Sequence, residues 1–336
     1  MPLFLRQLSV LACTVVTAMF CAAPISAQPG DAPLQLEGKI ALGAARGRID
    51  HMAIDLERHR LFVAELGNDS VGVVDLESRK VVHRLAGMKE PQGIGYLPAG
   101  DTLVIANGGD GSARFFQGPD YAANGRIELG SDADNVRVDK AAKEIIVGYG
   151  GGALAVIDPD GRRRIADIRL PGHPESFQLD PSSKRIYVNV PRAHEIAVVD
   201  QATRRQVGAW PTGELSANFP LALDESHHRV LAVFRHPAML GVFQAQDGRR
   251  IAIVPTCGDS DDLFVDAKRS LVYVICGEGY VDVVAARAES YASLGRIATL
   301  SGARTGLFIP EIDRLVVAAR AKGSEPAAVW VLRPLL

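Results

Sequence analysis

The chain has 336 residues, of which 47% are hydrophobic and 23% charged, with 33 Gly and 19 Pro. This ordinary globular composition excludes intrinsic disorder, collagen-like repeats and coiled coils. The formal net charge of -2 gives no sign of a surface for polyanions, so nucleic acid is not an expected partner.

Residues 1–27 are predicted to be a secretory signal peptide. Arg6 supplies its positive start, residues 8–23 form an apolar run, and Ser26-Ala27 are small residues suited to cleavage. The run is shorter than the roughly 20 apolar residues of a spanning helix, and no later stretch is apolar enough to cross a bilayer. We therefore expect an exported bacterial protein, periplasmic or secreted, whose mature chain begins near Gln28 and has no membrane span.

Cysteine usage changes with that cleavage. The full chain has 4 Cys, too few for a disulfide scaffold at this length. Cleavage would remove Cys13 and Cys21 and leave Cys257 and Cys276. A pair of cysteines in an oxidising compartment predicts a disulfide, with a thiolate pair for a soft metal as the alternative.

One pattern recurs seven times in the rest of the chain. Each copy has an apolar strand that ends in Asp or Pro, then a polar turn and a second apolar strand. The first strands lie at 52–55, 95–98, 136–139, 177–180, 221–224, 263–266 and 307–310. Their ends are 41 to 44 residues apart, and a period of about 40 residues with four short strands is typical of propeller blades. We predict a single-domain, all-β, seven-bladed β-propeller over residues 28–336, with four-stranded blades.

The two ends of this region are complementary. Residues 38–42 resemble a fourth strand, such as the one at 125–129, and not a first strand. The last copy ends after residues 328–332 and supplies only three strands. We therefore expect the N-terminal strand to complete the last blade and to close the ring without open edges.

Some of the copies carry a family resemblance. The segments are Pro-Gln-Gly-Ile at 91–94 before Tyr-Leu-Pro at 96–98, Arg-Ile-Tyr-Val-Asn at 185–189, and Ile-Ala-Val-Val-Asp at 196–200. With them the mature chain resembles the YncE-like propellers built of YVTN repeats. The resemblance implies an exported seven-bladed propeller, in a family whose activities are mostly unsettled. Some relatives are reported to bind nucleic acid, but the mature charge of -3 (36 Lys+Arg against 39 Asp+Glu, once Arg6 is removed) argues against that here.

Candidate functional residues come from aligning the seven copies just before their first strands. One position, called here the ring position, is mostly acidic and holds Asp50, Gln92, Asp134, Glu175, Phe219, Asp261 and Arg304. The next position holds His51, Gly93, Asn135, Ser176, Pro220, Asp262 and Thr305. A repeat needs no such variety for packing, so ionisable residues here indicate function. We predict a ligand site at the channel mouth that consists of Asp50, His51, Gln92, Asp134, Asn135, Glu175, Ser176, Asn218, Asp261, Asp262 and Arg304.

The acidic residues also suggest a cation. The predicted ligands are Asp134, Asn135, Glu175, Asn218 and Asp261, which resemble in chemistry alone the cation site of gluconolactonase-type propellers. Such oxygen ligands suit Ca²⁺ or Mg²⁺. Alternatively, each acidic residue caps a turn or bonds the backbone of the neighbouring blade.

Three functions remain open from the sequence. The first is a propeller that binds a small molecule, a cation or a protein partner at its channel mouth. The second is a metal-dependent hydrolase of the lactonase type, with Asp261 or Glu175 as general base. The third is a metal carrier that uses histidines at the mouth, namely His51, His173, His194 and His236. The motifs HExxH, GxSxG and CxxC do not occur in the chain, which disfavours the enzyme classes that carry them.

Overall fold

The computed structural model describes residues 32–288 and 290–335. The predicted signal peptide lies outside the described residues. Within this part of the chain the regular structure is β-strand, apart from two 3₁₀ turns, η1 (Leu66–Asn68) and η2 (Pro191–Ala193). Short runs rich in Val and Ile, bounded by turn residues, favour strands because branched side chains pack well on a pleated surface.

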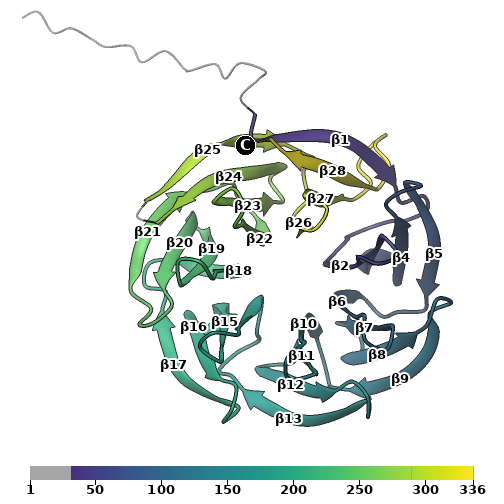
Figure 1. The fold of residues 1–336 in the computed structure, drawn as a ribbon, viewed down its shortest axis with the longest axis horizontal. Coiled ribbons are helices and arrows are strands. Elements are labelled where there is room, and N and C mark those ends of the chain that lie inside the picture. The colour runs from purple at the N-terminus through teal and green to yellow at the C-terminus, as the bar shows by residue number, and fades with distance from the viewer. Residues whose placement is uncertain (1–31, 289, 336) are drawn as a thin grey trace, which may run out of the picture. The chain divides into compact units, whose positions relative to one another are not determined.

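The described strands form seven antiparallel sheets of four strands each, arranged around a common centre (Figure 1). The innermost strands are β2 (Met52–Asp55), β6 (Pro91–Leu97), β10 (Ala133–Asp139), β14 (Phe177–Asp180), β18 (Ser216–Asp224), β22 (Ser260–Asp266) and β26 (Thr305–Ile309). The second strands are β3 (Arg60–Glu65), β7 (Thr102–Asn107), β11 (Glu144–Tyr149), β15 (Arg185–Val190), β19 (Arg229–His236), β23 (Leu271–Cys276) and β27 (Arg314–Ala319). The predicted seven-bladed propeller is therefore confirmed.

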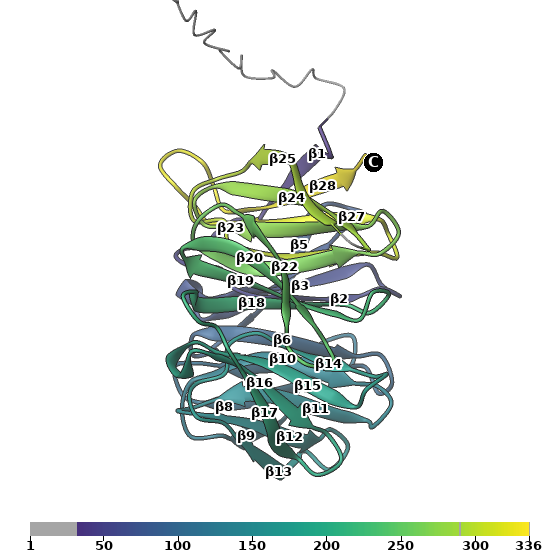
Figure 2. The same cartoon turned by 90° about the vertical axis from the view of Figure 1, so that its left-hand side faces the viewer.

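The two remaining strands of each blade lie further out. The third strands are β4 (Ser70–Asp75), β8 (Ser112–Gln117), β12 (Ala153–Asp158), β16 (Glu195–Asp200), β20 (Ala238–Gln244), β24 (Tyr280–Arg287) and β28 (Ala328–Pro334). The outer strands are β5 (Lys80–Ala86), β9 (Ala122–Glu128), β13 (Arg163–Arg169), β17 (Arg205–Pro211), β21 (Arg250–Pro255), β25 (Ser290–Ala298) and β1 (Leu34–Ala41). Side-on, the blades are twisted sheets that stack against one another (Figure 2).

The ring closes as the sequence predicts. The last sheet has the order β1-β28-β27-β26, so the first strand of the fold is the outer strand of the seventh blade. Its register runs from Leu34 opposite Pro334 to Ala41 opposite Ala328, with one bulge between Leu36 and Gly38. This pairing covers an edge that would otherwise expose unpaired N–H and C=O groups of β28.

Each repeated aspartate at the end of an innermost strand has a structural task. Asp55 shows it: its Oδ1 accepts hydrogen bonds from the backbone N–H groups of Glu57 at 3.0 Å and Arg58 at 3.2 Å. Arg58 then donates to Asp101 of the next blade at 2.8 Å. These aspartates cap turns at the ends of the strands that lie away from the ring position.

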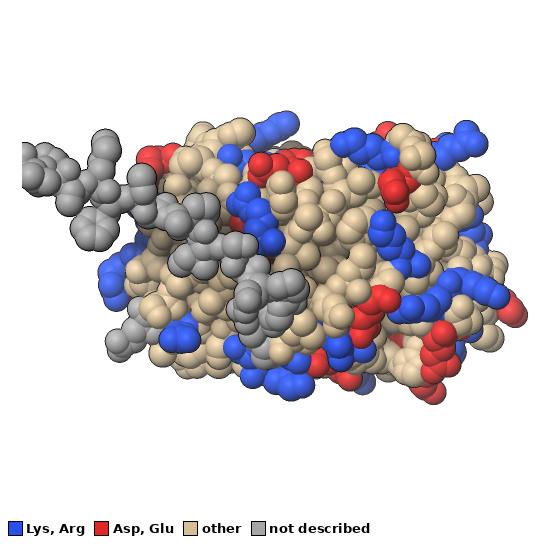
Figure 3. Space-filling model, turned by 90° about the horizontal axis from the view of Figure 1, so that it is seen from above, with Lys and Arg blue, Asp and Glu red and all other residues tan. Residues whose placement is uncertain are grey.

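The core lies between neighbouring blades. Ile40 of the last blade and Val63 of the first belong to one buried cluster, and Ile146 and Val188 join blades three and four in another. On the side of the ring seen in Figure 3, basic and acidic side chains are interspersed, without a run of one sign. Among the described residues, no helix is long and apolar enough to cross a membrane.

Candidate functional site

The residues at the ring position surround one cavity. Its volume is about 520 Å³. Six of the seven ring residues line it, namely Gln92, Asp134, Glu175, Phe219, Asp261 and Arg304. The seventh, Asp50, is 1% exposed and pairs with Arg48, whose guanidinium is 2.8 Å from its carboxylate. A cavity of this size is within the range of small-molecule sites.

A second repeat position contributes to the same cavity. It lies two residues before the ring position and holds Arg48, Glu90, Asp132, His173, Ala217, Asp259 and Gly302. Arg48, Asp132 and His173 line the cavity, and Asp259 is 2.9 Å from Arg304. The sequence prediction did not include Arg48, Asp132 or Asp259, although the alignment of repeats that defines the ring position also identifies them.

The backbone at this earlier position explains how the loops turn into the mouth. Five of its seven residues have positive φ, from 49° at Glu90 and 43° at Asp132 to 58° at Ala217 and Asp259 and 90° at Gly302. Gly93 has a different constraint, because a Cβ there would lie 2.1 Å from the carbonyl oxygen of Asp134. Glycine at 93 therefore lets β6 approach β10 closely, and this close packing places Asp134 at the mouth.

Asp134, His173 and Glu175 form what we call the acid–histidine group. One ligand atom from each lies within 4.8 Å of those of the other two. Asp134 is 6% exposed, yet its Oδ1 has no hydrogen-bond partner among the described residues. A buried carboxylate oxygen without a partner is costly, so this atom is free to bind a cation.

The histidine of this group has a defined tautomer. Its Nδ1 lies 2.6 Å from the carbonyl oxygen of Gly150. A carbonyl only accepts, so Nδ1 carries the proton and neutral His173 keeps its lone pair on Nε2. Nε2 lies 3.9 Å from the Asp134 carboxylate. Ligand histidines in metal sites are held in this way, with the other ring nitrogen donating to a carbonyl or carboxylate.

Across the mouth, Arg48, Arg235 and Arg304 surround Asp261 and form what we call the arginine group. The distances from their guanidinium nitrogens to the Asp261 carboxylate are 3.9, 2.8 and 3.8 Å. Arg235 also donates from Nε to the carbonyl of Ser260 at 2.9 Å and lies 3.8 Å above the ring of Phe219. These contacts hold its guanidinium in one orientation.

His51 lies between the two groups. Its Nδ1 is 3.3 Å from Asp262 and its Nε2 is 4.0 Å from Asp134. Burial opposes protonation, but the carboxylates of Asp262, Asp50 and Asp134 together outweigh it and raise the pKa of His51 to about 10. His51 is therefore a charged imidazolium at neutral pH and neutralises acids at the mouth.

The predicted cation ligands do not all meet. Asp261 belongs to the arginine group, and the amide of Asn218 donates to Asn189 at 2.9 Å and to the carbonyl of Glu195 at 3.0 Å. Asn135 is 2% exposed, and its amide oxygen has no partner among the described residues. Asp134 and Glu175 lie together and His173 joins them, while Asn135, with its unpartnered amide oxygen, stays a predicted ligand. The sequence predicts a role for His173 only in the metal-carrier alternative and not in the cation site, because a lone His in a loop is usually only solvent-exposed.

The other predicted residues have structural or peripheral positions. The hydroxyl of Ser176 donates to the carbonyl of Leu221 at 3.4 Å, and Asp262 accepts from the backbone N–H of Gly306 at 2.8 Å. His194 and His236 are exposed and do not line the cavity. Only two of the four histidines proposed for a metal carrier, His51 and His173, come together.

Two acids and one histidine at the mouth have raised pKa values. Burial, reinforced by the charge of Asp134, raises the pKa of Glu175 to about 8. Burial also raises the pKa of Asp50 to about 7, against the opposing charges of His51 and Arg48. Burial disfavours protonated His173, yet Asp134 and the Gly150 carbonyl together raise its pKa to about 9. The site is thus crowded with negative charge, and protons partly compensate for it.

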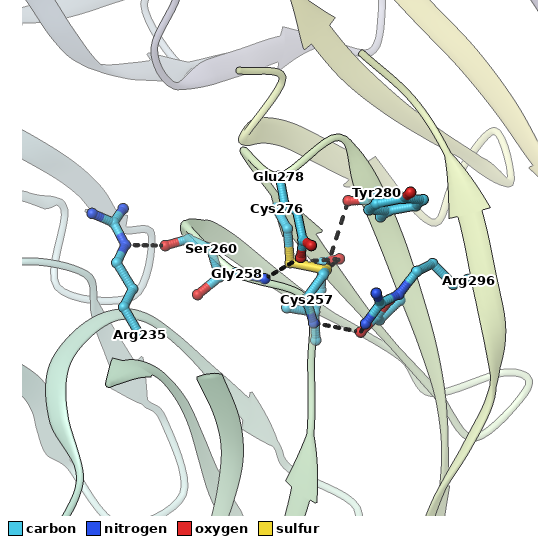
Figure 4. Close-up of a disulfide and its surroundings, with 10 residues drawn as sticks. Arg235, Cys257, Gly258, Ser260, Cys276, Glu278, Tyr280 and Arg296 are labelled. Atoms are coloured by element: carbon cyan, nitrogen blue, oxygen red, sulfur yellow. Dashed lines mark hydrogen bonds and ion pairs between the residues drawn. A yellow bond between two sulfur atoms is a disulfide. The ribbon is translucent and has the colours of Figure 1, made fainter. Parts of the chain in front are cut away.

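A disulfide joins Cys257 to Cys276 close to Ser260, whose carbonyl accepts the hydrogen bond from Arg235 (Figure 4). The backbone N–H of Gly258 donates to Glu278 at 2.8 Å, and that of Gly277 donates to the carbonyl of Asp259 at 2.8 Å. The loop that carries Asp259 and leads into Asp261 at the start of β22 is therefore tied to the end of β23 by covalent and hydrogen bonds. Both cysteines are buried.

Replacement of both cysteines by alanine should lower the free energy of unfolding by about 3 kcal/mol. The bridge closes a loop with a sequence separation of 19, and a loop of that length gives an effect of this size. Chemical denaturation measures it, with reduced wild-type protein as the matched control. An unchanged denaturation midpoint in both samples would contradict the prediction.

Comparison with known proteins gives the fold and no family. No protein-family model matches the chain, and no curated protein matches its sequence. Solved structures match most of the chain. The structure titled "Kuenenia stuttgartiensis Hydrazine Synthase" matches with 16% sequence identity and a TM-score of 0.72, over 84% of this chain and 96% of that one. The WD40 repeats of RRP9 match at 11% identity and a TM-score of 0.75, over 91% and 99% of the two chains. At these identities the likeness establishes a β-propeller repeat protein, and function must be argued from the site.

Proposed function

We propose that this protein is a ligand-binding propeller that holds a divalent cation in its channel mouth. Asp134, His173 and Glu175 are the cation ligands. The unpartnered Oδ1 of buried Asp134 carries this proposal. A cation would satisfy that oxygen and offset the repulsion between the two carboxylates.

The ligand set selects the kind of cation. Ca²⁺ and Mg²⁺, expected from an all-oxygen site, prefer oxygen ligands. An imidazole with two carboxylates is better suited to Mn²⁺, Fe²⁺ or Zn²⁺. Three protein ligands also leave coordination positions open toward the cavity, where a small ligand can reach the metal.

Titration calorimetry with Mn²⁺ tests the cation site. Wild-type protein should bind one Mn²⁺ per chain at pH 8, and H173Q should weaken binding at least tenfold because it removes the imidazole ligand. H194Q is the matched control, since that histidine lies outside the cavity. Equal Mn²⁺ affinity in H173Q and wild type would refute the acid–histidine group as the site.

A metal-dependent hydrolase is the second candidate function. The open coordination positions favour it, because a bound cation could polarise a substrate carbonyl. Asp261 is held by Arg235 and Glu175 is a ligand of the proposed cation, so neither general base expected from the sequence is free in this function. Hydrolysis of a panel of lactones by metal-loaded protein, abolished by a chelator, tests this function.

We also propose that the protein works outside the cytoplasm. The predicted signal peptide and the resemblance to exported YncE-like propellers support this, and a disulfide is typical of oxidising compartments. Fractionation of cells that express the full chain, followed by N-terminal sequencing, tests both export and cleavage near Ala27. The metal-carrier function loses support, because His194 and His236 are exposed outside the cavity.

A further inference from the structure

We propose that the ligand of this mouth is a small carboxylate anion, which binds to the arginine group and Arg192 and reaches the cation with another oxygen. The inference rests on the proposed function, because it assumes an occupied acid–histidine group. It adds the chemical class of the ligand, for which the structure gives three separate reasons.

The first reason is the charge balance of the mouth. Arg48 pairs with Asp50 at 2.8 Å, Arg235 with Asp261 at 2.8 Å, and Arg304 with Asp259 at 2.9 Å, while His51 lies 3.3 Å from Asp262. A divalent cation would balance Asp134 and Glu175. Each of these carboxylates then has a counter-charge.

Two further charged residues line the cavity, Asp132 and Arg192. Asp132 lies 3.5 Å from Nδ1 of His173, whereas Arg192 lies in η2 next to Pro191. No carboxylate lies within 4.0 Å of its guanidinium in residues 32–288 or 290–335. A guanidinium presents five N–H donors in a fixed fork that matches a carboxylate. An incoming anion would provide the partner that the chain itself does not.

The second reason is the geometry of the arginine group. Asp261 has three guanidinium groups within 4.0 Å, so this part of the mouth already stabilises a carboxylate. Arg235 is fixed by Phe219, Ser260 and Asp261 and loses little freedom when an anion arrives. Preorganised donors of this kind favour binding because their ordering cost is already met.

The third reason is the lining of the cavity. Most of its side chains are charged or polar, with Phe219 and Pro191 as the larger apolar contributions. Such a wall gives a hydrophobic ligand little to contact, whereas it provides directed donors for an anion. The volume of about 520 Å³ accommodates a small molecule with two polar ends. A dicarboxylate is the simplest compound with two such ends, one for the arginine group and one for the cation.

Succinate is the probe, and succinamide, which has the same shape without charge, is its matched control. Titration calorimetry of Mn²⁺-loaded protein should show succinate binding with a Kd below about 1 mM. Succinamide should bind at least tenfold more weakly. Inorganic phosphate, added as a third probe, should bind more weakly than succinate.

Two variants assign the binding to arginines. R192A and R304Q should each raise the Kd of succinate at least tenfold in Mn²⁺-loaded protein. R205A is the control, since Arg205 is exposed on outer strand β17 and should leave the Kd unchanged. A Mn²⁺ titration of each variant checks that the acid–histidine group is intact, and circular dichroism checks the fold.

The outcomes separate this inference from the proposed function. If Mn²⁺ binds but succinate does not, the carboxylate inference alone is overturned. Equal binding of succinamide, or tighter binding of phosphate, also overturns it, in the second case in favour of phosphate ligands. If Mn²⁺ does not bind wild-type protein, the proposed function fails and the inference with it.

Discussion

Deletion of residues 34–42 should abolish cooperative unfolding of the propeller or cause the protein to aggregate. The segment contains β1, which pairs with β28 along its length, and it buries Leu34, Ile40 and Leu42 almost completely. Each buried aliphatic side chain contributes about 1.5–3 kcal/mol, so their loss is comparable to the whole stability of a domain. The exposed edge of β28 then invites pairing between molecules.

Point variants in β1 keep this prediction testable if the truncated protein is insoluble. I40A should lower the free energy of unfolding by about 2–5 kcal/mol, because Ile40 is 1% exposed. L36A is the matched control in the same strand: Leu36 is 42% exposed, and its loss should cost less than about 0.5 kcal/mol. Thermal and chemical denaturation measure both. Equal effects of the two variants would contradict closure of the ring by packing of β1.

The second large effect concerns pH and the cation. Without a cation, the melting temperature should fall by about 5 °C between pH 6 and pH 8.5, equivalent to about 2 kcal/mol in a chain of this size. The folded protein raises the pKa of His51 to about 10, of His173 to about 9 and of Glu175 to about 8. It therefore binds these protons more tightly than the unfolded chain does, and the resulting stability is lost as pH rises.

The sign follows for each group. The stability that comes from the two protonated histidines is complete below the unfolded pKa of about 6.5. It is lost as the pH rises toward 9 for His173 and toward 10 for His51. The stability that comes from protonated Glu175 and Asp50 begins to decrease at a lower pH than that of the histidines. It is lost above about pH 8 for Glu175 and above about pH 7 for Asp50. Asp134 has a lowered pKa, so its contribution is constant across the range tested.

Mn²⁺ should reverse this trend. A cation stabilises the folded state by binding to it selectively, and it competes with protons for its ligands. Its stabilisation should therefore be larger at pH 8.5 than at pH 6. D134N should lose the Mn²⁺ effect, whereas D120N, at an exposed position remote from the mouth, should retain it. Stabilisation of D134N to the wild-type extent would refute the assignment of Asp134 as a ligand.

The sequence by itself determined the number of blades, the closure of the ring by its first strand, and the face on which ionisable residues collect. These follow from local patterns, because a repeat of fixed length places equivalent residues at equivalent points of a ring. The ring position alone therefore predicts six of the residues that line the cavity.

Only the tertiary structure decided which of these residues act together. Asp134 and Glu175 meet His173, while Asp261 is surrounded by Arg48, Arg235 and Arg304. Apart from Arg48, these partners come from neighbouring blades. The distances between them depend on loop conformation and side-chain direction as well as on register. The repeat fixes where each backbone lies, and the packing of the loops fixes which charges face one another.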